Sequence, residues 1–173
     1  MRVLRTVTFA YDVAEDRIAA VLNVGTSEAW ACWLTRRITL PILRQVQGLL
    51  DRTSALAWQA GAEFRTEIAA FEREAAVANL SGALRPTPAD SLKTSAAQAK
   101  CLERLTITPQ GGAFQLTLQT SANDGASGLI ERADVHRILQ MLRGEVHKAS
   151  WIEAAAPAPD TSASVPKSSS VRH

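Results

Sequence analysis

Long apolar runs and paired cysteines are what this sequence most clearly lacks. No run approaches the roughly 20 apolar residues that a membrane-spanning helix needs, so we expect no membrane association through such a helix. Residues 1–6 contain no continuous apolar stretch, so no secretory signal is expected. The only cysteines, Cys32 and Cys101, are too few for a disulfide framework. We therefore expect a cytoplasmic protein whose thiols are reduced.

Sequence motifs of catalysis and cofactor binding are also missing. The chain has no glycine-rich phosphate-binding motif, no G-x-S-x-G elbow and no cysteine pair at metal-ligand spacing. His136 and His147 lie on one expected helix about three turns apart, too far to share a metal ion, and we expect both to be exposed. The sequence thus predicts no catalytic residue, no cofactor and no metal site, and it favours a protein that is not an enzyme.

An excess of charge of one sign is missing as well. The formal net charge is +2, which is too small to indicate nucleic-acid binding by itself. Apolar residues make up 46% of the chain and charged residues 21%, as in an ordinary globular protein. At 173 residues the chain is long enough to bury a core in a single domain.

What the sequence does contain is an approximate internal repeat. In the first half, residues 1–52, alternation of apolar and polar residues predicts three short strands, which cover residues 3–11, 18–24 and 30–34. An amphipathic helix follows. It begins either at Thr35, with a kink at Pro41, or near Leu40, with Thr39 as the cap and Pro41 in the tolerated first turn.

The second half, residues 100–152, repeats this order. Strict alternation from Phe114 to Gln119 predicts a half-buried strand, preceded by a strand around Leu105 and Ile107. Asn123-Asp124-Gly125 indicates a loop over residues 121–128, and a short third strand is expected at 129–130. A closing amphipathic helix follows, beside which Trp151 is expected to dock.

Between the halves, the sequence predicts one extra helix over residues 55–78, weakened at Gly61. Its narrow apolar stripe is expected to face one partner and comprises Phe64, Ile68, Phe71, Ala75 and Ala78. Residues 81–99 are rich in Pro, Ser, Thr and Ala and predict a flexible linker. Residues 153–173 have the composition of a disordered tail.

These patterns predict an α+β fold: two pseudo-repeated β-β-β-α units, with an antiparallel sheet and helices on one face, form a single domain over residues 1–152. The order of elements is similar to the tandem β-β-β-β-α repeats of single-strand nucleic-acid binders of the PUR and whirly type. That resemblance lies in topology alone, because each unit has a strand fewer and no motif of those proteins is matched. It therefore carries over no functional residue.

Trp30, Trp33, Arg36 and Arg37 are the most notable polar and aromatic group. Arginine at the exit of an aromatic strand can bind phosphate or stack on a base. Solubility and pairing with nearby acids are the simpler explanation of the two arginines. Two tryptophans three residues apart cannot both point inward from a flat strand. Together with the polar strand face at Gln115, Thr117 and Gln119, these residues form the candidate surface for a partner or a nucleic acid.

Two hypotheses of function follow. The favoured one is an interaction or accessory protein that binds a protein partner, or a second copy of itself, through exposed sheet edges and the stripe on the extra helix. The alternative is a single-stranded nucleic-acid-binding protein that uses the tryptophan and arginine surface. An enzyme would need a pocket that brings together groups distant in the sequence.

Overall fold

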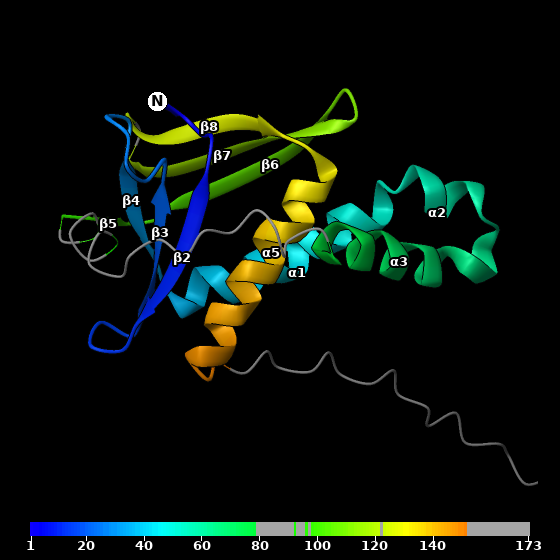
Figure 1. Cartoon of the computed structure of the whole chain (residues 1–173), viewed down its shortest axis with the longest axis horizontal. Coiled ribbons are helices and arrows are strands. Elements are labelled where there is room, and N and C mark those ends of the chain that lie inside the picture. The colour runs from blue at the N-terminus through cyan, green and yellow to red at the C-terminus, as the bar shows by residue number, and fades with distance from the viewer. Residues whose placement is uncertain (79–91, 93–95, 97, 122, 152–173) are drawn as a thin grey trace, which may run out of the picture.

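The computed structural model describes most of the chain, namely residues 1–78, 92, 96, 98–121 and 123–151. The predicted tail and most of the predicted linker lie outside these described residues. The described part confirms the α+β class, because two four-stranded sheets pack with helices (Figure 1).

Two units with the same order of elements build this fold. The first contains β1 (Arg2–Val3), β2 (Val7–Asp12), β3 (Arg17–Leu22), β4 (Trp30–Leu34) and α1 (Arg36–Arg52). The second contains β5 (Lys100–Cys101), β6 (Arg104–Gln110), β7 (Ala113–Ser121), β8 (Asp124–Ile130) and α5 (Arg132–Lys148). Between them lie α2 (Ala55–Gln59), the 3₁₀ helix η1 (Ala62–Phe64) and α3 (Arg65–Ala78). Each unit thus has one short strand more than the sequence predicts.

The two extra strands are exchanged between the units. Strands β2, β3 and β4 form one antiparallel meander, and β6, β7 and β8 form the other. Strand β1 pairs in parallel with β8, whereas β5 pairs in parallel with β4. The N–H of Leu4 donates to the Ser127 carbonyl and that of Leu102 to the Trp33 carbonyl, both at 2.8 Å. Each sheet therefore contains strands from both halves of the chain.

A constant spacing relates the two units. Ile18 pairs with Leu34 in the first sheet, and Phe114 pairs with Ile130 in the second, 96 residues further along. Helices α1 and α5 both have 17 residues, and their first residues, Arg36 and Arg132, are separated by the same 96 positions. Four buried positions of α1 recur at equivalent places in α5: Thr39, Leu43, Val46 and Leu50 correspond to Val135, Leu139, Leu142 and Val146. The predicted pseudo-repeat thus holds at the level of single residues.

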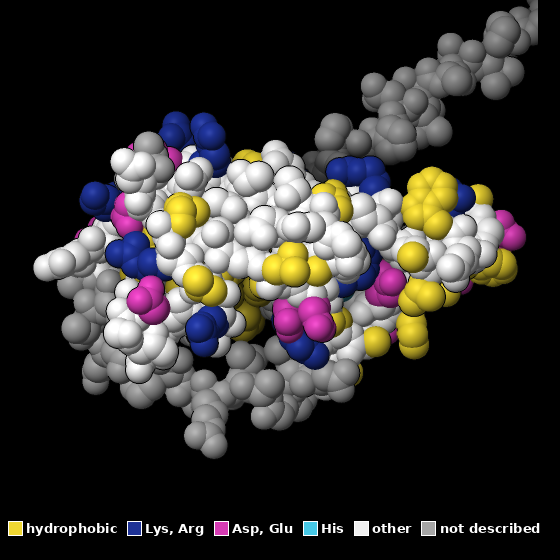
Figure 2. Space-filling view, turned by 90° about the horizontal axis from the view of Figure 1, so that it is seen from above, with side chains coloured by type: hydrophobic (Ala, Val, Ile, Leu, Met, Phe, Trp, Pro, Cys, Tyr) yellow, Lys and Arg dark blue, Asp and Glu magenta, His cyan; other side chains and the backbone are white. Residues whose placement is uncertain are grey.

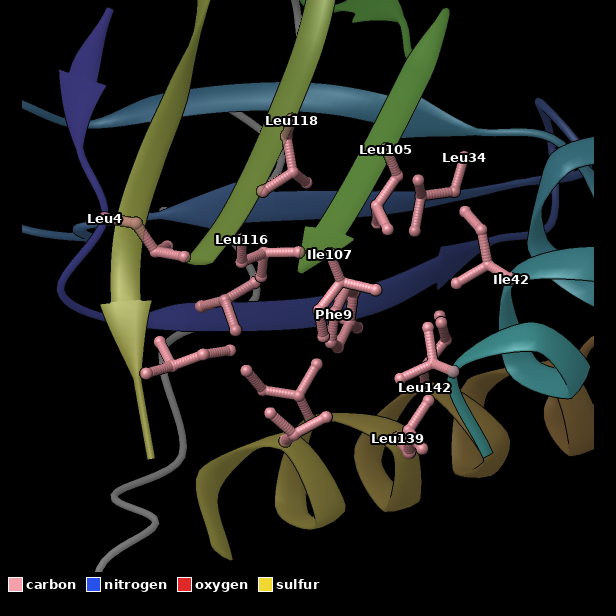
Figure 3. A pocket seen from close by; sticks show the side chains of 15 residues that line it. Leu4, Phe9, Leu34, Ile42, Leu105, Ile107, Leu116, Leu118, Leu139 and Leu142 are labelled. Carbon is pink, nitrogen blue, oxygen red and sulfur yellow. The ribbon is translucent and has the colours of Figure 1, made fainter. Parts of the chain in front are cut away.

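The inner faces of both sheets and the two long helices share one core. Helix α5 packs against β2, and α1 lies beside β6, so each helix neighbours the first long strand of the other unit. Strand β7 buries alternate residues (Phe114, Leu116 and Leu118), as its pattern predicts. In Figure 3, side chains from these elements converge on a cavity of about 40 Å³ that only apolar residues line.

The first strand differs from its prediction, because residues 3–11 divide between two sheets. The buried side chain of Asn23 binds the backbone at the point where the chain passes from one sheet to the other. Its Oδ1 accepts from the backbone N–H groups of Arg5 at 2.9 Å and Thr6 at 3.2 Å, and its Nδ2 donates to the Val3 carbonyl at 2.6 Å. One amide side chain thus replaces the sheet partners that these residues would otherwise need.

The last strand is longer than predicted, because β8 begins at Asp124 and not at 129. The glycines taken as loop residues lie in the strand, where neighbouring backbone approaches closely. A Cβ atom on Gly125 would overlap the Leu118 carbonyl oxygen, and one on Gly128 would lie 2.7 Å from that of Leu4. Close packing therefore accounts for both glycines.

Helix α1 takes the first of its two predicted starts. Thr35 is its N-cap residue, and Pro41 lies inside the helix. Thr39, the alternative cap, is instead buried in the second turn, where its hydroxyl donates to the Thr35 carbonyl at 2.9 Å. Helix α1 therefore accommodates Pro41 in its interior, and Thr39 belongs to the core and not to the cap.

Candidate functional site

A helical arm formed by α2, η1 and α3 extends away from the two sheets (Figure 1). The sequence predicts one helix over residues 55–78, but the chain leaves α2 at Ala60 and turns at Gly61 before η1. Ser54 begins the arm, since its hydroxyl accepts the Ala57 N–H at 3.0 Å and so caps α2.

Large apolar side chains gather on this arm, and Figure 2 shows them at the end of the molecule where the arm lies. Leu56 is 54% exposed, Trp58 58%, Phe64 52% and Phe71 66%. These four are half of the exposed large hydrophobic residues in the described part of the chain. Their clustering marks a surface suited to binding, because single exposed apolar residues are common but groups are not.

Trp58 is held in one orientation despite its exposure. Its indole Nε1 donates to the Arg52 carbonyl at 2.9 Å. The Arg65 guanidinium lies over the indole ring at 4.1 Å from its centre, an attractive cation–π contact. An aromatic side chain fixed in this way loses little conformational entropy when a partner covers it.

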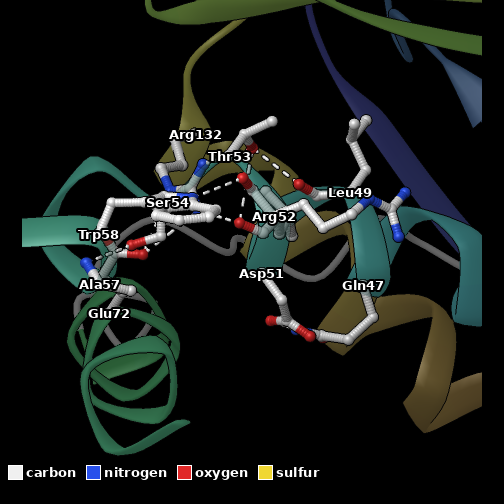
Figure 4. A network of polar contacts seen from close by, with 11 residues as sticks. Gln47, Leu49, Asp51, Arg52, Thr53, Ser54, Ala57, Trp58, Glu72 and Arg132 are labelled. Atoms are coloured by element: carbon white, nitrogen blue, oxygen red, sulfur yellow. Dashed lines mark hydrogen bonds and ion pairs between the residues drawn. The ribbon is translucent and has the colours of Figure 1, made fainter. Parts of the chain in front are cut away.

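The base of the arm is tied to the rest of the fold through Arg132 at the start of α5 (Figure 4). Its guanidinium donates to the Leu50 carbonyl, and to the Thr53 hydroxyl at 3.1 Å. It also forms an ion pair at 3.3 Å with Glu72 on α3. No local pattern in the sequence singles out Arg132, because these partners lie about 60 to 80 residues away.

The predicted stripe on α3 faces away from the protein's own core. The opposite side of α3 packs inward through Glu72 and through buried Ala76, whose carbonyl accepts from Arg137 Nε at 3.1 Å. Phe64 and Phe71 are exposed, and Ile68 is half-buried. The stripe is thus placed where an outside partner can contact it.

The predicted tryptophan and arginine group is divided by the first sheet. Trp30 points into the core and is only 8% exposed. Trp33 points to the other face, where it packs with a small cluster that includes Leu92 and Ala96. Arg36 and Arg37 are exposed in the first turn of α1. Trp30 therefore offers no ring face for stacking.

Gln115, Thr117 and Gln119 lie elsewhere, on the outer face of the second sheet. Thr117 stands between Thr106 on β6 and Ser127 on β8, and Gln119 is opposite Arg104. These side chains form flat, mostly uncharged rows on the second sheet, whereas Trp30 and Trp33 belong to the first. The structure thus separates the candidate residues into two surfaces.

His136 and Cys32 are titratable groups of the core, and they do not belong to one common site. His136 is buried, contrary to the expected exposed position, and burial lowers its pKa, with a further contribution from nearby Arg132. Cys32 is also buried, which raises the pKa of its thiol to about 12, whereas Cys101 on the neighbouring strand β5 is exposed. Among the described residues, no three His, Cys, Asp or Glu side chains are grouped to hold a metal ion.

Comparison with protein families, with curated proteins and with solved structures finds no match for this chain. None of the helices in the described ranges is both long and apolar enough to cross a bilayer.

Proposed function

We propose that this protein is a non-enzymatic accessory protein that binds a protein partner through the helical arm. The observation that carries the proposal is the exposure of Leu56, Trp58, Phe64 and Phe71 on one projecting element. Tryptophan is enriched among the residues that supply most binding energy in protein interfaces, and phenylalanine is enriched in interface cores. Reduced Cys32 and Cys101 fit the cytoplasm as the proposed compartment.

The position of the arm in the pseudo-repeat supports this role. It is inserted after α1, and within the described residues nothing equivalent follows α5. The shared core is therefore built by elements that both units possess, and the arm adds exposed apolar surface to it. An insertion that exposes apolar side chains adds little to the stability of the core, so a binding role explains it better.

The charges beside the aromatic residues indicate the kind of partner. The Arg65 guanidinium stacks on Trp58, so the exposed indole has a cationic neighbour. A complementary protein surface would present an apolar groove bordered by Asp or Glu. The aromatic side chains would fill the groove, and the carboxylates would orient the complex.

The test compares proteins in which one exposed apolar residue is made polar. Trp58→Ser and Phe71→Ser alter the arm, whereas Leu129→Ser alters an equally exposed residue (59%) on the second sheet. Partners recovered with the wild-type chain are purified, and their affinities for the three variants are measured by calorimetry. We expect a loss of at least tenfold for Trp58→Ser and little change for Leu129→Ser. Equal affinities for all variants would contradict the proposal.

Self-association through the arm is the other form of this proposal. Sedimentation equilibrium of the wild type would then show a dimer that Trp58→Ser dissociates, while Leu129→Ser leaves it intact. A protein that is monomeric at all concentrations and recovers no partner sensitive to Trp58 would remove the arm as a binding surface.

A single-stranded nucleic acid is the second candidate partner, and the outer face of the second sheet favours it. Thr106, Thr117 and Gln119 form a flat polar surface with Arg104 on the same face, and the order of strands and helix in each unit is β-β-β-β-α. Fluorescence anisotropy with a labelled oligonucleotide tests it. Binding should weaken steeply with added salt and should be reduced by Arg104→Glu. No binding at low salt would eliminate this candidate.

A further inference from the structure

A groove lies between α1 and the edge strand β6, on a surface separate from the arm's exposed stripe. It has a volume of about 430 Å³. Helix α1 lines it with Ile42, Leu49 and Arg52, and β6 lines it with Leu105, Thr106 and Ile107. The side chain of Thr106 points to the outer face and those of its two neighbours point inward, so the groove runs along the edge of the strand.

The backbone of β6 presents unpaired groups to this groove. Strand β6 is the last strand of its sheet, and it pairs only with β7 among the described residues. Gln110 and Ala113 close a two-residue turn, so hydrogen bonds to β7 fall at even-numbered positions. The N–H and C=O groups of Leu105 and Ile107 therefore point toward the groove, and Pro109, at the next such position, has no N–H to offer.

The equivalent edge in the first unit is covered. There the Tyr11 N–H, on edge strand β2, donates at 2.8 Å to Oε2 of Glu145 from α5. Trp151 packs edge-on against the Tyr11 ring at 6.0 Å, and both donate to Asp16, which holds the pKa of that carboxyl below its usual value. By the spacing of 96 residues, Leu49 stands where Glu145 stands. The edge of the second sheet thus meets a leucine from α1 in place of the carboxylate that caps the edge of the first sheet.

We propose that this groove binds an extended peptide, which adds to β6 as a further strand of the second sheet. Leu105 and Ile107 supply the backbone donors and acceptors, and Leu49 and Ile42 receive alternate apolar side chains of the peptide. Arg52 is the one charged residue among those that line the groove, so the peptide carries an Asp or Glu at that end. The groove is a second binding surface, and it does not depend on the arm having a partner.

The experiment uses the full chain and an array of eight-residue peptides that alternate Val and Thr, with one Glu moved along the sequence. Affinity is measured by fluorescence anisotropy, and the site by nitrogen-15 chemical shifts of the protein. We expect the tightest peptides to perturb the Leu105 and Ile107 amides and to lose at least tenfold in affinity when backbone N-methylation removes their donors. Failure of every peptide to bind would overturn the proposal, as would equal binding of the N-methylated peptides.

Two variants with a matched control complete the test. Leu49→Glu places on α1 the carboxylate that closes the other edge, and we expect it to abolish binding. Arg52→Glu should weaken Glu-containing peptides at least fivefold and favour Lys-containing ones, even if Leu49→Glu fails to fold. Arg44→Glu changes an exposed α1 residue outside the groove lining and should have no effect. Pairing of β6 with a second copy, seen as a dimer that peptides do not displace, would also overturn the proposal.

Discussion

The first long strands of the two units, β2 and β6, occupy equivalent places, yet among the described residues only the edge of β2 is covered. Glu145 and Trp151 close that edge, while the edge of β6 faces the groove beside Leu49. A free edge is an open template for another strand, and proteins usually protect it. The contrast shows that the repeated fold does not by itself leave an edge strand open, because the edge of β2 is closed in the same chain.

The outer faces of the two sheets differ in the same way. The first sheet carries Ala19, Val21 and Ala31 outward, and Leu92 and Ala96 cover them. The second sheet carries Gln115, Thr117 and Ser127 at these places, and all three are only partly buried. The buried positions of α1 and α5 are apolar in both units apart from Thr39, His136 and Glu145. The units therefore agree where they build the core and differ where they meet solvent, which is where partners bind.

The largest expected effect tests whether the two units share one core. Leu43→Ala and Leu139→Ala remove equivalent buried side chains, and each should lower the free energy of unfolding by about 2–5 kcal/mol. Urea denaturation, followed by circular dichroism and tryptophan fluorescence, should show one transition for both variants. Two separate transitions would mean that the units unfold independently.

The next comparison concerns Arg132 and its equivalent, Arg36. Arg132→Met removes the bonds to Leu50, Thr53 and Glu72, so we expect a loss of about 2–3 kcal/mol, since hydrogen bonds to charged groups are among the stronger ones. Arg36→Met alters an exposed side chain and should change the free energy of unfolding by no more than about 0.5 kcal/mol. Hydrogen exchange should locate the loss in α3. Equal effects of the two variants would contradict this account.

A third comparison uses Gly128 and its equivalent, Cys32. Gly128→Ala places a Cβ against the Leu4 carbonyl, and this overpacking should lower the free energy of unfolding by about 1–3 kcal/mol. Cys32→Ala only shortens a buried side chain and should cost about 1 kcal/mol. Thermal unfolding of both variants checks the order. A harmless Gly128→Ala would show that β1 does not pack so closely on β8.

The smallest expected effect is a gain, from His136→Leu, which copies Leu40 from the first unit. Within the described residues neither ring nitrogen of His136 has a hydrogen-bond partner, so the variant should stabilise the fold by about 1 kcal/mol at pH 7. The folded-state pKa of His136 is lowered from 6.5 by burial, so below pH 6.5 the unfolded chain binds a proton that the folded chain does not.

Wild-type stability should therefore be full above pH 6.5 and fall as the pH drops below it. His136 contributes to the slope of the free energy of unfolding against pH. That contribution should vanish in His136→Leu, as measured by urea denaturation between pH 7.5 and 5. An unchanged slope would assign the pH dependence to groups other than His136. Asp124 is not one of them, because hydrogen bonds from Thr120 and Arg2 lower its pKa from 3.8, so it titrates below this pH range.

Much of this fold could be predicted from local patterns. Strict alternation over β7 and the periods of α1 and α5 predicted those elements, because each buries one face against a common core. The short strands β1 and β5 were missed, since two residues carry no measurable period. The start of β8 was missed because glycine indicates both a turn and a close backbone contact.

The candidate surfaces were predicted less well. Phe64 and Phe71 were predicted as part of a partner-facing stripe and do lie exposed, but the exposed Trp58 was not among the predicted surface residues. Trp30 and Trp33 were expected to differ in direction, and no pattern in the sequence decides which of them turns inward. Exposure of a single side chain depends on what packs over it, and that is set by distant residues.

The sequence alone determined two sheet-and-helix units and the helical insertion between them, because hydrophobic period is a local property. Only the tertiary structure decided that the units exchange their short strands, that Arg132 fixes the arm, and that Glu145 closes one edge while Leu49 leaves the other open. These outcomes depend on contacts between residues far apart in the chain, which no local pattern specifies.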